Sequence, residues 1–135
     1  MSVRRGEIYM TELPDVGEHI QHGYRPVVVV QNNIGNKYSP TTVVVAVTTK
    51  KDNKWYLPTH IRINRQPGVR ENSKVLCEQV HTVCQSKLEN KIGTLSRRKI
   101  IELNIAMAVS VIPALVEVSC QHYKVKNKAA IEKGI

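Results

Sequence analysis

Short runs of β-branched side chains dominate the first two thirds of this chain and predict strands. Residues 5–13 alternate loosely between apolar and polar, as in a strand with one buried face. Residues 27–30 are four consecutive valines, which predicts a strand buried on both faces, and residues 41–48 predict the next strand. Weaker patterns predict an edge strand, a long or broken strand and a short strand, over residues 56–63, 74–84 and 92–95.

One amphipathic helix is predicted after the strands. Ser96 is typical of a helix N-cap, and apolar side chains then recur near a period of 3.6 over residues 97–112. The recurring positions are expected to form one stripe that faces the core, and Pro113 is expected to end or kink the helix. The stripe consists of Ile100, Ile101, Leu103, Ala106, Met107, Ala108, Val111 and Ile112.

Polar segments rich in Asn, Gly and Pro separate the strands. Residues 14–23 are predicted to be a loop, and residues 32–36 and 39–40 to be turns. Several short strands followed by one helix indicate a mainly β fold, a small antiparallel barrel closed by a C-terminal helix. Residues 1–116 are expected to form this barrel domain, and residues 117–135 a basic C-terminal tail, either flexible or a loosely docked helix.

The composition is that of one ordinary soluble domain. The 135 residues are 41% hydrophobic and 23% charged, and no apolar run approaches the roughly 20 residues that span a bilayer. The amino-terminal residues contain no apolar segment typical of a secretory signal. The three cysteines lack a C-x-x-C spacing, which favours reduced structural thiols in a cytoplasmic protein and no metal site. No cofactor is predicted.

The positive charge of the chain is concentrated in one segment. The formal net charge is +9, and residues 19–70 carry eight Lys and Arg against one Asp. Such a field raises the local concentration of polyanions and speeds their encounter. A charge that serves solubility alone is the alternative. Because the same segment contains Arg25 and Thr48, nucleic acid is the favoured partner.

Arg25 and Thr48 stand at the polar ends of the two most apolar strands. Arg25 precedes the valine run and Thr48 follows Val43–Val47, so rigid backbone can bring the two side chains together. A guanidinium stays charged and donates two hydrogen bonds to phosphate oxygens, and Thr48 adds a hydroxyl donor with few rotamers. The pair predicts a phosphate site; a surface arginine and a plain strand-end threonine are the structural alternatives.

Five short motifs follow one another along the chain. They are Arg5-Gly6-Glu7-Ile8-Tyr9, Arg25-Pro26-Val27-Val28-Val29-Val30-Gln31-Asn32, Val47-Thr48, Leu57-Pro58-Thr59-His60-Ile61 and Glu78-Gln79-Val80. Each motif alone is weak, but in this order and spacing, over roughly residues 3–116, the chain resembles the MazF/PemK-type toxins, endoribonucleases of bacterial toxin–antitoxin modules. The resemblance implies an SH3-like β-barrel with helices, a homodimer and a cognate antitoxin.

The resemblance also implies a reaction and two catalytic residues. Toxins of this kind cleave single-stranded RNA at short sequences without a metal ion. The 2′-hydroxyl of the substrate attacks the adjacent phosphate, which leaves a 2′,3′-cyclic phosphate and a 5′-hydroxyl. The catalytic arginine of the family falls on Arg25 and its catalytic threonine on Thr48. A preorganised donor such as Arg25 lowers a barrier of this kind by roughly 3–4 kcal/mol.

Residues around this pair are candidates for holding RNA. The loop departs from the family in carrying His19 and His22, which suit acid–base work, although exposed loop histidines are commoner. Gln79 suits either a base edge or a barrel hydrogen bond, and Trp55 either stacks on a base or packs on the protein. The predicted substrate-binding residues are His19, Gln21, His22, Pro26, Thr49, Lys50, Trp55 and Gln79.

Three functions stay open at this point. The first is a sequence-specific endoribonuclease toxin that acts on single-stranded RNA and is neutralised by an antitoxin. The second is a non-catalytic toxin on the same fold that poisons DNA gyrase, which leaves Arg25 and Thr48 without a role. The third is a passive RNA-binding module, against which the single Trp, five Tyr and absence of Phe argue.

Overall fold

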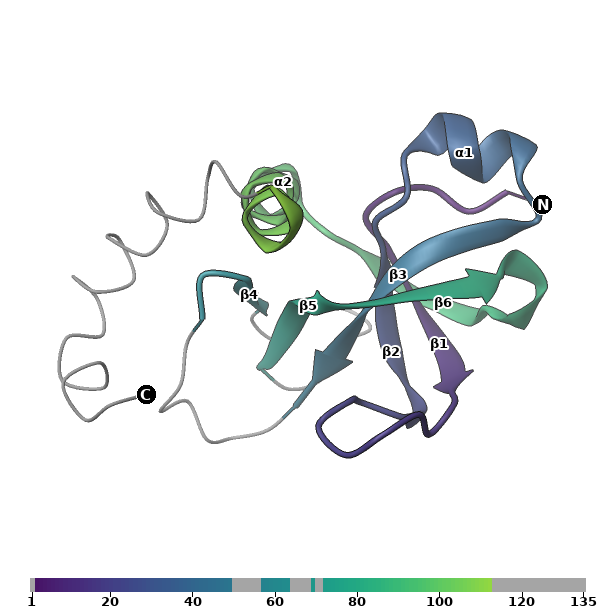
Figure 1. Cartoon of the computed structure of the whole chain (residues 1–135). Coiled ribbons are helices and arrows are strands. Elements are labelled where there is room, and N and C mark those ends of the chain that lie inside the picture. The colour runs from purple at the N-terminus through teal and green to yellow at the C-terminus, as the bar shows by residue number, and fades with distance from the viewer. Residues whose placement is uncertain (1, 50–56, 64–68, 70–71, 113–135) are drawn as a thin grey trace, which may run out of the picture.

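The structure is a computed structural model, and it describes residues 2–49, 57–63, 69 and 72–112. In these ranges six antiparallel strands form one curled, barrel-like sheet, which confirms the mainly β fold (Figure 1). The strands are β1 Glu7–Leu13, β2 Gly23–Val29, β3 Thr41–Thr48, β4 His60–Ile63, β5 Ser73–Cys84 and β6 Glu89–Thr94. The helices are α1 Asn33–Tyr38, the short 3-10 helix η1 Gln85–Lys87 and α2 Arg97–Val111.

The β-branched runs form the centre of the sheet because their side chains fill both of its faces. The strand order is β4-β5-β3-β2-β1-β6, so β2 and β3 lie inside the sheet and β4 lies at an edge, as predicted. Val28 and Val45 pack with Leu103 of α2 in one apolar cluster. Val27 and Ala46 belong to a second cluster, and because strand residues alternate, this cluster lies on the opposite face. The candidate site is on this second face.

The helix predicted after Ser96 is confirmed, but its apolar stripe is only partly buried. The Ser96 side-chain oxygen accepts a hydrogen bond from the Lys99 N–H at 3.2 Å and so caps α2. Leu103 is fully buried against the sheet. The expectation that the whole stripe faces the core is wrong for Ile101, Val111 and Ile112, which are exposed. The apolar positions reach further around the helix than the strip that packs on the sheet.

A short helix, α1, stands where a turn was predicted, so that prediction is wrong. Asn32 Oδ1 accepts a hydrogen bond from the Gly35 N–H at 2.8 Å and caps the helix. The buried Asn36 amide accepts from Thr42 Oγ1 at 2.6 Å and donates to the Gln31 carbonyl oxygen at 2.9 Å. A cap and one buried amide therefore stabilise a six-residue helix whose Gly and Asn residues have low helix propensity.

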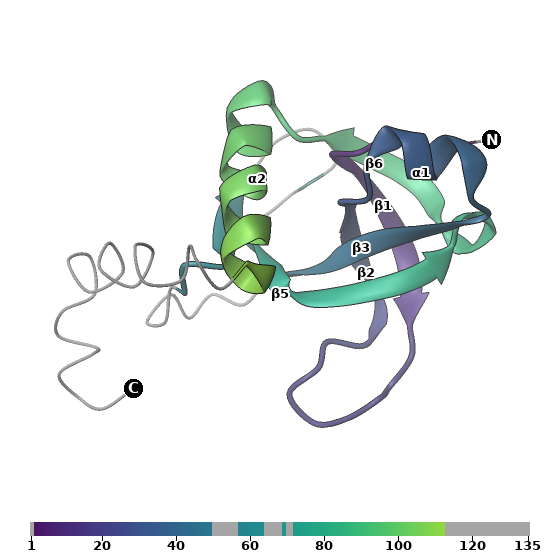
Figure 2. The same ribbon diagram turned by 45° about the horizontal axis from the view of Figure 1, so that its top comes forward.

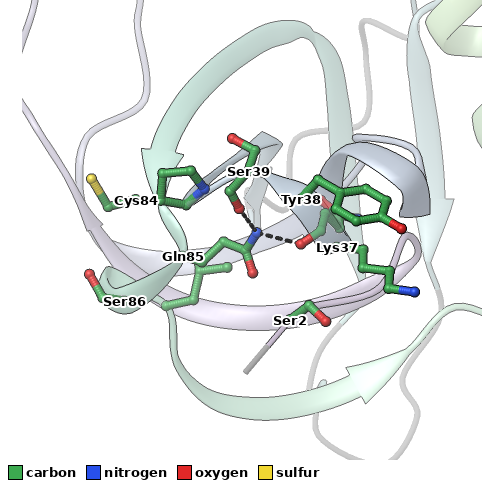
Figure 3. Close-up of a pocket in the computed structure, with 10 residues that line it drawn as sticks. Ser2, Lys37, Tyr38, Ser39, Cys84, Gln85 and Ser86 are labelled. Atoms are coloured by element: carbon green, nitrogen blue, oxygen red, sulfur yellow. Dashed lines mark hydrogen bonds between the residues drawn. The ribbon is translucent and has the colours of Figure 1, made fainter.

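The two ends of the central strands carry different structures. Helix α1 lies at one end, near the amino-terminus, and the loop of residues 14–22 projects from the other (Figures 1 and 2). At the α1 end, Gln85 Nε2 donates to the carbonyl oxygens of Asn36 and Ser39, at 2.8 and 2.7 Å (Figure 3). A surface hollow of about 830 Å³ lies beside these contacts. Cys84 lines it and is exposed, so this thiol is not one of the buried structural thiols that the sequence favours.

The structure tests some of the remaining predictions about cysteines, membrane helices and domain organisation. Cys77 is buried as expected, and burial raises the pKa of its thiol to about 12. No helix within the described ranges is long and apolar enough to cross a membrane. Residues 117–135 lie outside the described part, so the division into a barrel domain and a tail stays a prediction.

Candidate functional site

Arg25 lies on β2 with its guanidinium directed at the end of β3. Its Nε donates a hydrogen bond to the His22 carbonyl oxygen at 2.7 Å, and one Nη donates to the Val47 carbonyl oxygen at 3.5 Å. The same Nη donates to the side-chain oxygen of Gln21. These three contacts fix the charged fork in one position, and a fixed donor stabilises an anion more effectively than a mobile one.

Thr48 lies level with Arg25 on the neighbouring strand. The β2–β3 ladder pairs Val27 with Ala46, so two residues further along the ladder Arg25 is level with Thr48. Side chains at the same level of adjacent strands project from one face of the sheet. Thr48 is buried, with 8% of its surface exposed, and Thr11 of β1 pairs with Arg25 from the other side. The structure thus brings together the two residues predicted to be catalytic.

Two further cations continue this level across the sheet. Lys74 of β5 pairs with Thr48, and Arg62 of β4 pairs with Lys74. Directly opposite side chains have Cβ atoms about 4.5–5.5 Å apart. Thr48 therefore stands between Arg25 and Lys74 in what we name the cation row, Arg25–Thr48–Lys74–Arg62. Positive side chains therefore stand on the strands on both sides of the Thr48 hydroxyl.

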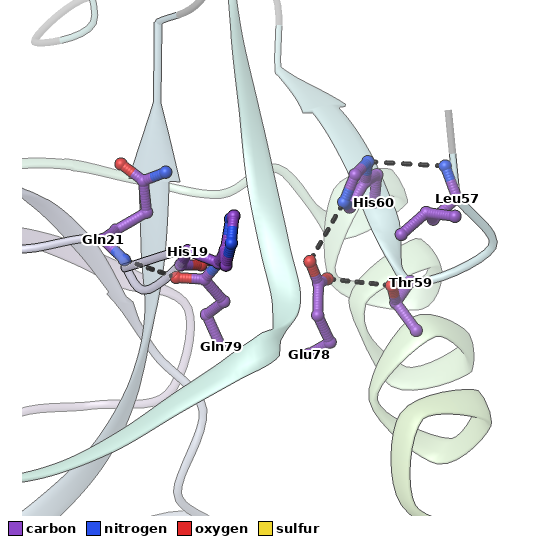
Figure 4. Close-up of polar contacts among 7 residues, drawn as sticks. All are labelled: His19, Gln21, Leu57, Thr59, His60, Glu78 and Gln79. Carbon is purple, nitrogen blue, oxygen red and sulfur yellow. Dashed lines mark hydrogen bonds and ion pairs between the residues drawn. The ribbon is translucent and has the colours of Figure 1, made fainter. Parts of the chain in front are cut away.

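Gln79 ties the loop of residues 14–22 to the sheet. The Gln21 N–H donates to Gln79 Oε1 at 2.8 Å, and Gln79 Nε2 donates to the His19 carbonyl oxygen at 3.0 Å (Figure 4). These two hydrogen bonds form the Gln79 latch. Since the Gln21 side chain also contacts Arg25, the latch positions the guanidinium through the loop. A hollow of about 670 Å³ is lined by Arg25 and by the loop residues Asp15, Gly17, Glu18, His19, Ile20, Gln21 and His22.

An irregularity in β5 directs Glu78 and Gln79 to different sides. Val45 and Ala46 are consecutive on β3, but their partners on β5 are Val80 and Leu76, so residues 77–79 form a bulge. A bulge re-aims side chains and is common beside active sites. Gln79 accordingly meets the loop on one side of β5, and Glu78 points to the other side, toward β4 and α2 (Figure 4).

Glu78 fixes the segment that leads into β4. Its carboxylate accepts from Thr59 Oγ1 at 2.8 Å and lies 3.1 Å from His60 Nε2 (Figure 4). Burial raises the pKa of the Glu78 carboxyl, but hydrogen bonds from His60, its own backbone and Thr59 outweigh burial, and the pKa lies below its ordinary value. The charged carboxylate therefore holds residues 57–60 beside the site.

The predicted loop histidines contribute backbone atoms to the site. The His19 imidazole is 98% exposed, whereas its carbonyl oxygen takes part in the Gln79 latch. His22 is also exposed, and its carbonyl oxygen accepts from Arg25. Both histidines line the hollow that Arg25 borders, but among the described residues neither ring forms a hydrogen bond with the guanidinium. Gln21 and Gln79, by contrast, are both brought to the surroundings of Arg25.

The other predicted substrate residues differ in whether the structure places them near Arg25 and Thr48. Thr49 follows Thr48 and is exposed. Pro26 projects from the face of β2 opposite to Arg25, because neighbouring strand residues alternate. Lys50 and Trp55 lie outside the described residues. Among the residues that are described, no three His, Cys, Asp or Glu side chains are placed to hold a metal ion.

Three residues of the site face, Arg62, Lys74 and His81, were not predicted. His81 pairs with Val44, which shares a face with Thr48, and its Nε2 is buried with no hydrogen-bond partner in the described part of the chain. Burial and the charge of Arg25 lower the pKa of His81. A period of two from Gln79 to His81 was the sequence signal for this face, but the bulge before it hid the register.

Comparison with known proteins places this arrangement among toxins. The family model described as PemK-like, MazF-like toxin of type II toxin–antitoxin system matches residues 4–111. The chain is 40% identical over 109 residues to endoribonuclease MazF of Staphylococcus epidermidis and, equally, to that of Staphylococcus saprophyticus. Each alignment covers 80% of this chain and 90% of the relative.

Solved structures support the same fold. A mycobacterial endoribonuclease in complex with its cognate antitoxin is similar at a TM-score of 0.66 and 22% identity, covering 83% of this chain and 98% of that one. MazF from Deinococcus radiodurans is similar at a TM-score of 0.66 and 18% identity, covering 80% of this chain and 94% of that one. At these identities the likeness concerns the barrel-like fold.

Proposed function

Since the chain belongs to the family of PemK-like, MazF-like toxins of type II toxin–antitoxin systems, we propose that it is an endoribonuclease toxin that cleaves single-stranded RNA at the cation row. One observation carries the proposal: Arg25 and Thr48 are level on neighbouring strands, on one face, in a chain 40% identical to endoribonucleases. A gyrase poison that acts through protein contact leaves this pair of side chains without a role.

Cleavage in this proposal is an internal transfer at phosphorus. The substrate's 2′-oxygen forms a bond to the adjacent phosphorus, the bond from phosphorus to the 5′-oxygen breaks, and a proton moves from the 2′-hydroxyl to the leaving oxygen through solvent or protein. The products are a 2′,3′-cyclic phosphate and a 5′-hydroxyl. No water is consumed, so the protein needs to hold the phosphate and stabilise charge rather than activate a nucleophilic water.

The cation row supplies that stabilisation. The Arg25 guanidinium donates hydrogen bonds to the non-bridging phosphate oxygens as their charge grows, and the Thr48 hydroxyl donates a further hydrogen bond to the same phosphate. Lys74, on the other side of Thr48, adds a positive charge one strand away. Each preorganised donor is expected to lower the barrier by roughly 3–4 kcal/mol. The phosphate takes the place of the Gln21 oxygen on Arg25 Nη.

The proposed partners follow from charge and exposure. The toxin is neutralised by a cognate antitoxin, and a segment with acidic and apolar side chains fits the basic face around Arg25 and the loop of residues 14–22. A second copy of the chain is proposed to form a homodimer, for which the exposed apolar residues of α2, such as Ile101 and Ile105, offer surface. Action on cellular RNA places the protein in the cytoplasm.

Cleavage of a long single-stranded RNA in the presence of EDTA tests the proposed function. The wild-type protein is expected to give discrete cuts, and Arg25→Ala to give none while keeping the same melting temperature. Arg97→Ala removes an exposed arginine on α2 and is the matched control, which should cut like the wild type. Inhibition of DNA gyrase by a wild-type protein that leaves RNA intact would support the alternative instead.

A further inference from the structure

His81 carries a buried polar atom that the proposed cleavage does not use. Its Nε2 is enclosed by protein and has no hydrogen-bond partner among the described residues. Leaving a buried polar atom unpaired is unfavourable, so such an atom in a native fold calls for a reason. The ring lies on the face that holds the cation row, because His81 pairs with Val44 and Val44 shares a face with Thr48.

Its distance from the cation row suits a neighbouring nucleotide. Val44 and Thr48 are four residues apart, so His81 lies roughly 13 Å along β3 from the level of Thr48. That separation is too long for contact with the phosphate above Thr48. The charge of the Arg25 guanidinium is nevertheless near enough to lower the pKa of His81.

The surroundings of His81 on this face are apolar, and Gln79 is the neighbouring polar side chain on β5. Val44 lies across the strand pair, Val83 follows on the same face, and Val27 and Ala46 belong to the same cluster. Gln79, two residues before His81, forms the latch that holds the loop over this part of the sheet. An apolar floor with a single polar atom is the chemistry that binds a flat ring by its face and orients it by its edge.

We propose that His81 reads the edge of the nucleobase next to the scissile phosphate, with Nε2 making one hydrogen bond to that base. The inference rests on the proposed ribonuclease function and names a specificity residue for it. The base reaches His81 when the Gln79 latch opens, and it then supplies the partner that Nε2 lacks. Arg25 and Thr48 hold the phosphate, whereas His81 decides which base lies beside it.

Protonation of the His81 ring changes the hydrogen bond that it can form with a base. A neutral imidazole offers one hydrogen-bond donor and one acceptor, but a protonated imidazole only donates. Protonation of His81 therefore changes which nucleobase edge can form a hydrogen bond with it. Arg25 from β2 and Glu7 and Tyr9 from β1 are titratable or charged groups on this face, with Lys74 further along β5 and Asp15, Glu18, His19 and His22 on the loop. Because burial and Arg25 disfavour the charged ring, His81 is neutral at neutral pH.

The test is a map of cutting preference. RNA pools randomised on both sides of the wild-type cut site are cleaved, and the 5′-hydroxyl ends are sequenced. The proteins compared are wild type, His81→Ala, His81→Gln, Arg25→Ala and, as the matched control, Thr82→Ala, whose side chain is exposed on the other face of β5. The wild type and His81→Gln are also assayed at a series of pH values that falls from about 7.5.

His81→Ala should lose preference at one position adjacent to the cut, by about ten- to hundredfold, with the other positions and the cyclic-phosphate ends unchanged. The same position should change preference in the wild type as the pH falls through the lowered pKa of His81, and not in His81→Gln. If His81→Ala does not fold, His81→Gln and the pH comparison decide. Unchanged preference, or an equal loss at every position, would overturn the assignment, whereas a wild type that cuts nothing would overturn the ribonuclease function itself.

Discussion

The Gln79 latch predicts how a substitution on β5 changes a loop on the other side of the site. Gln79→Leu keeps the size of the side chain but removes both hydrogen bonds to the loop, from the Gln21 N–H and to the His19 carbonyl oxygen. The loop should then open more often. Because the loop also holds Arg25 through Gln21 and His22, the guanidinium should lose its fixed position.

The size of the effect follows from the two bonds. A typical hydrogen bond contributes a net 0.5–1.5 kcal/mol, and these two lie at a partly buried and an exposed position, so the latch is expected to contribute about 1–2 kcal/mol. That corresponds to an increase of about 5- to 30-fold in the open population. The amide of Gln21, which the latch protects, should exchange its hydrogen faster by this factor.

Native-state hydrogen exchange measures this directly. The Gln21 amide should accelerate in Gln79→Leu, while amides in the centre of β3, such as that of Val44, should keep their rates. Val80→Ala changes an exposed neighbour on β5 and is the control, expected to leave the loop unaffected. An unchanged Gln21 rate in a folded Gln79→Leu protein would show that the latch does not hold the loop, and the positioning of Arg25 through Gln21 would fall with it.

Three further predictions concern the catalytic cation and the fold beneath it. Arg25→Lys keeps a positive charge but cannot donate at Nε and Nη together, so kcat should fall by about 10²–10³-fold with the melting temperature unchanged; a smaller fall would mean that charge alone suffices. Glu7→Gln should destabilise the protein by about 1.5–3 kcal/mol at pH 7. Burial raises the pKa of Glu7, but hydrogen bonds from Lys91, the backbone and Tyr9 outweigh it, so the pKa is lowered. The stabilisation by the Glu7 carboxylate is therefore present above pH ~4.5 and lost as pH falls through the lowered pKa. Denaturant titrations at pH 7 and below pH ~4.5 should show that the difference in stability between wild type and Glu7→Gln closes at the lower pH. Gly6→Ala should cost about 1–3 kcal/mol, measured by the same titrations, since Gly6 has φ +90° and a Cβ there would lie 2.5 Å from Ile100 Cδ1; an unchanged midpoint would contradict that clash.

The strands were predictable because burial on two faces leaves a strong pattern. Residues 41–48 became β3 with the predicted bounds, and the N-cap Ser96 marked the start of α2, whereas β2 begins at Gly23, four residues before the valine run that predicted it. Helix α1 was not predictable from local pattern, because its stability comes from the cap at Asn32 and from contacts of Asn36 with residues on other elements. The exposed part of the α2 stripe was equally hidden, since periodicity shows an apolar side but not how wide the contact is.

The candidate site shows the same division. Arg25 and Thr48 were predictable as strand-end residues, and the pairing of β2 with β3 brings them level. Pro26 was placed in the site by its neighbourhood in the sequence, although the alternation of a strand turns it to the other face. Lys74 and His81 were missed because their level relative to Thr48 depends on the β5 bulge, which only the three-dimensional pairing reveals.

The central claim is that RNA is cut by its own 2′-hydroxyl at the phosphate held by Arg25 and Thr48. A short RNA that contains one cut site, with a single 2′-deoxy substitution at the nucleotide on the 5′ side of the cut, tests it most directly. Mass spectrometry of the products should show a 2′,3′-cyclic phosphate and a 5′-hydroxyl from the all-RNA substrate and no cleavage of the substituted one. Cleavage of the substituted RNA at the same bond would contradict the mechanism, because another nucleophile would then have to attack the phosphate.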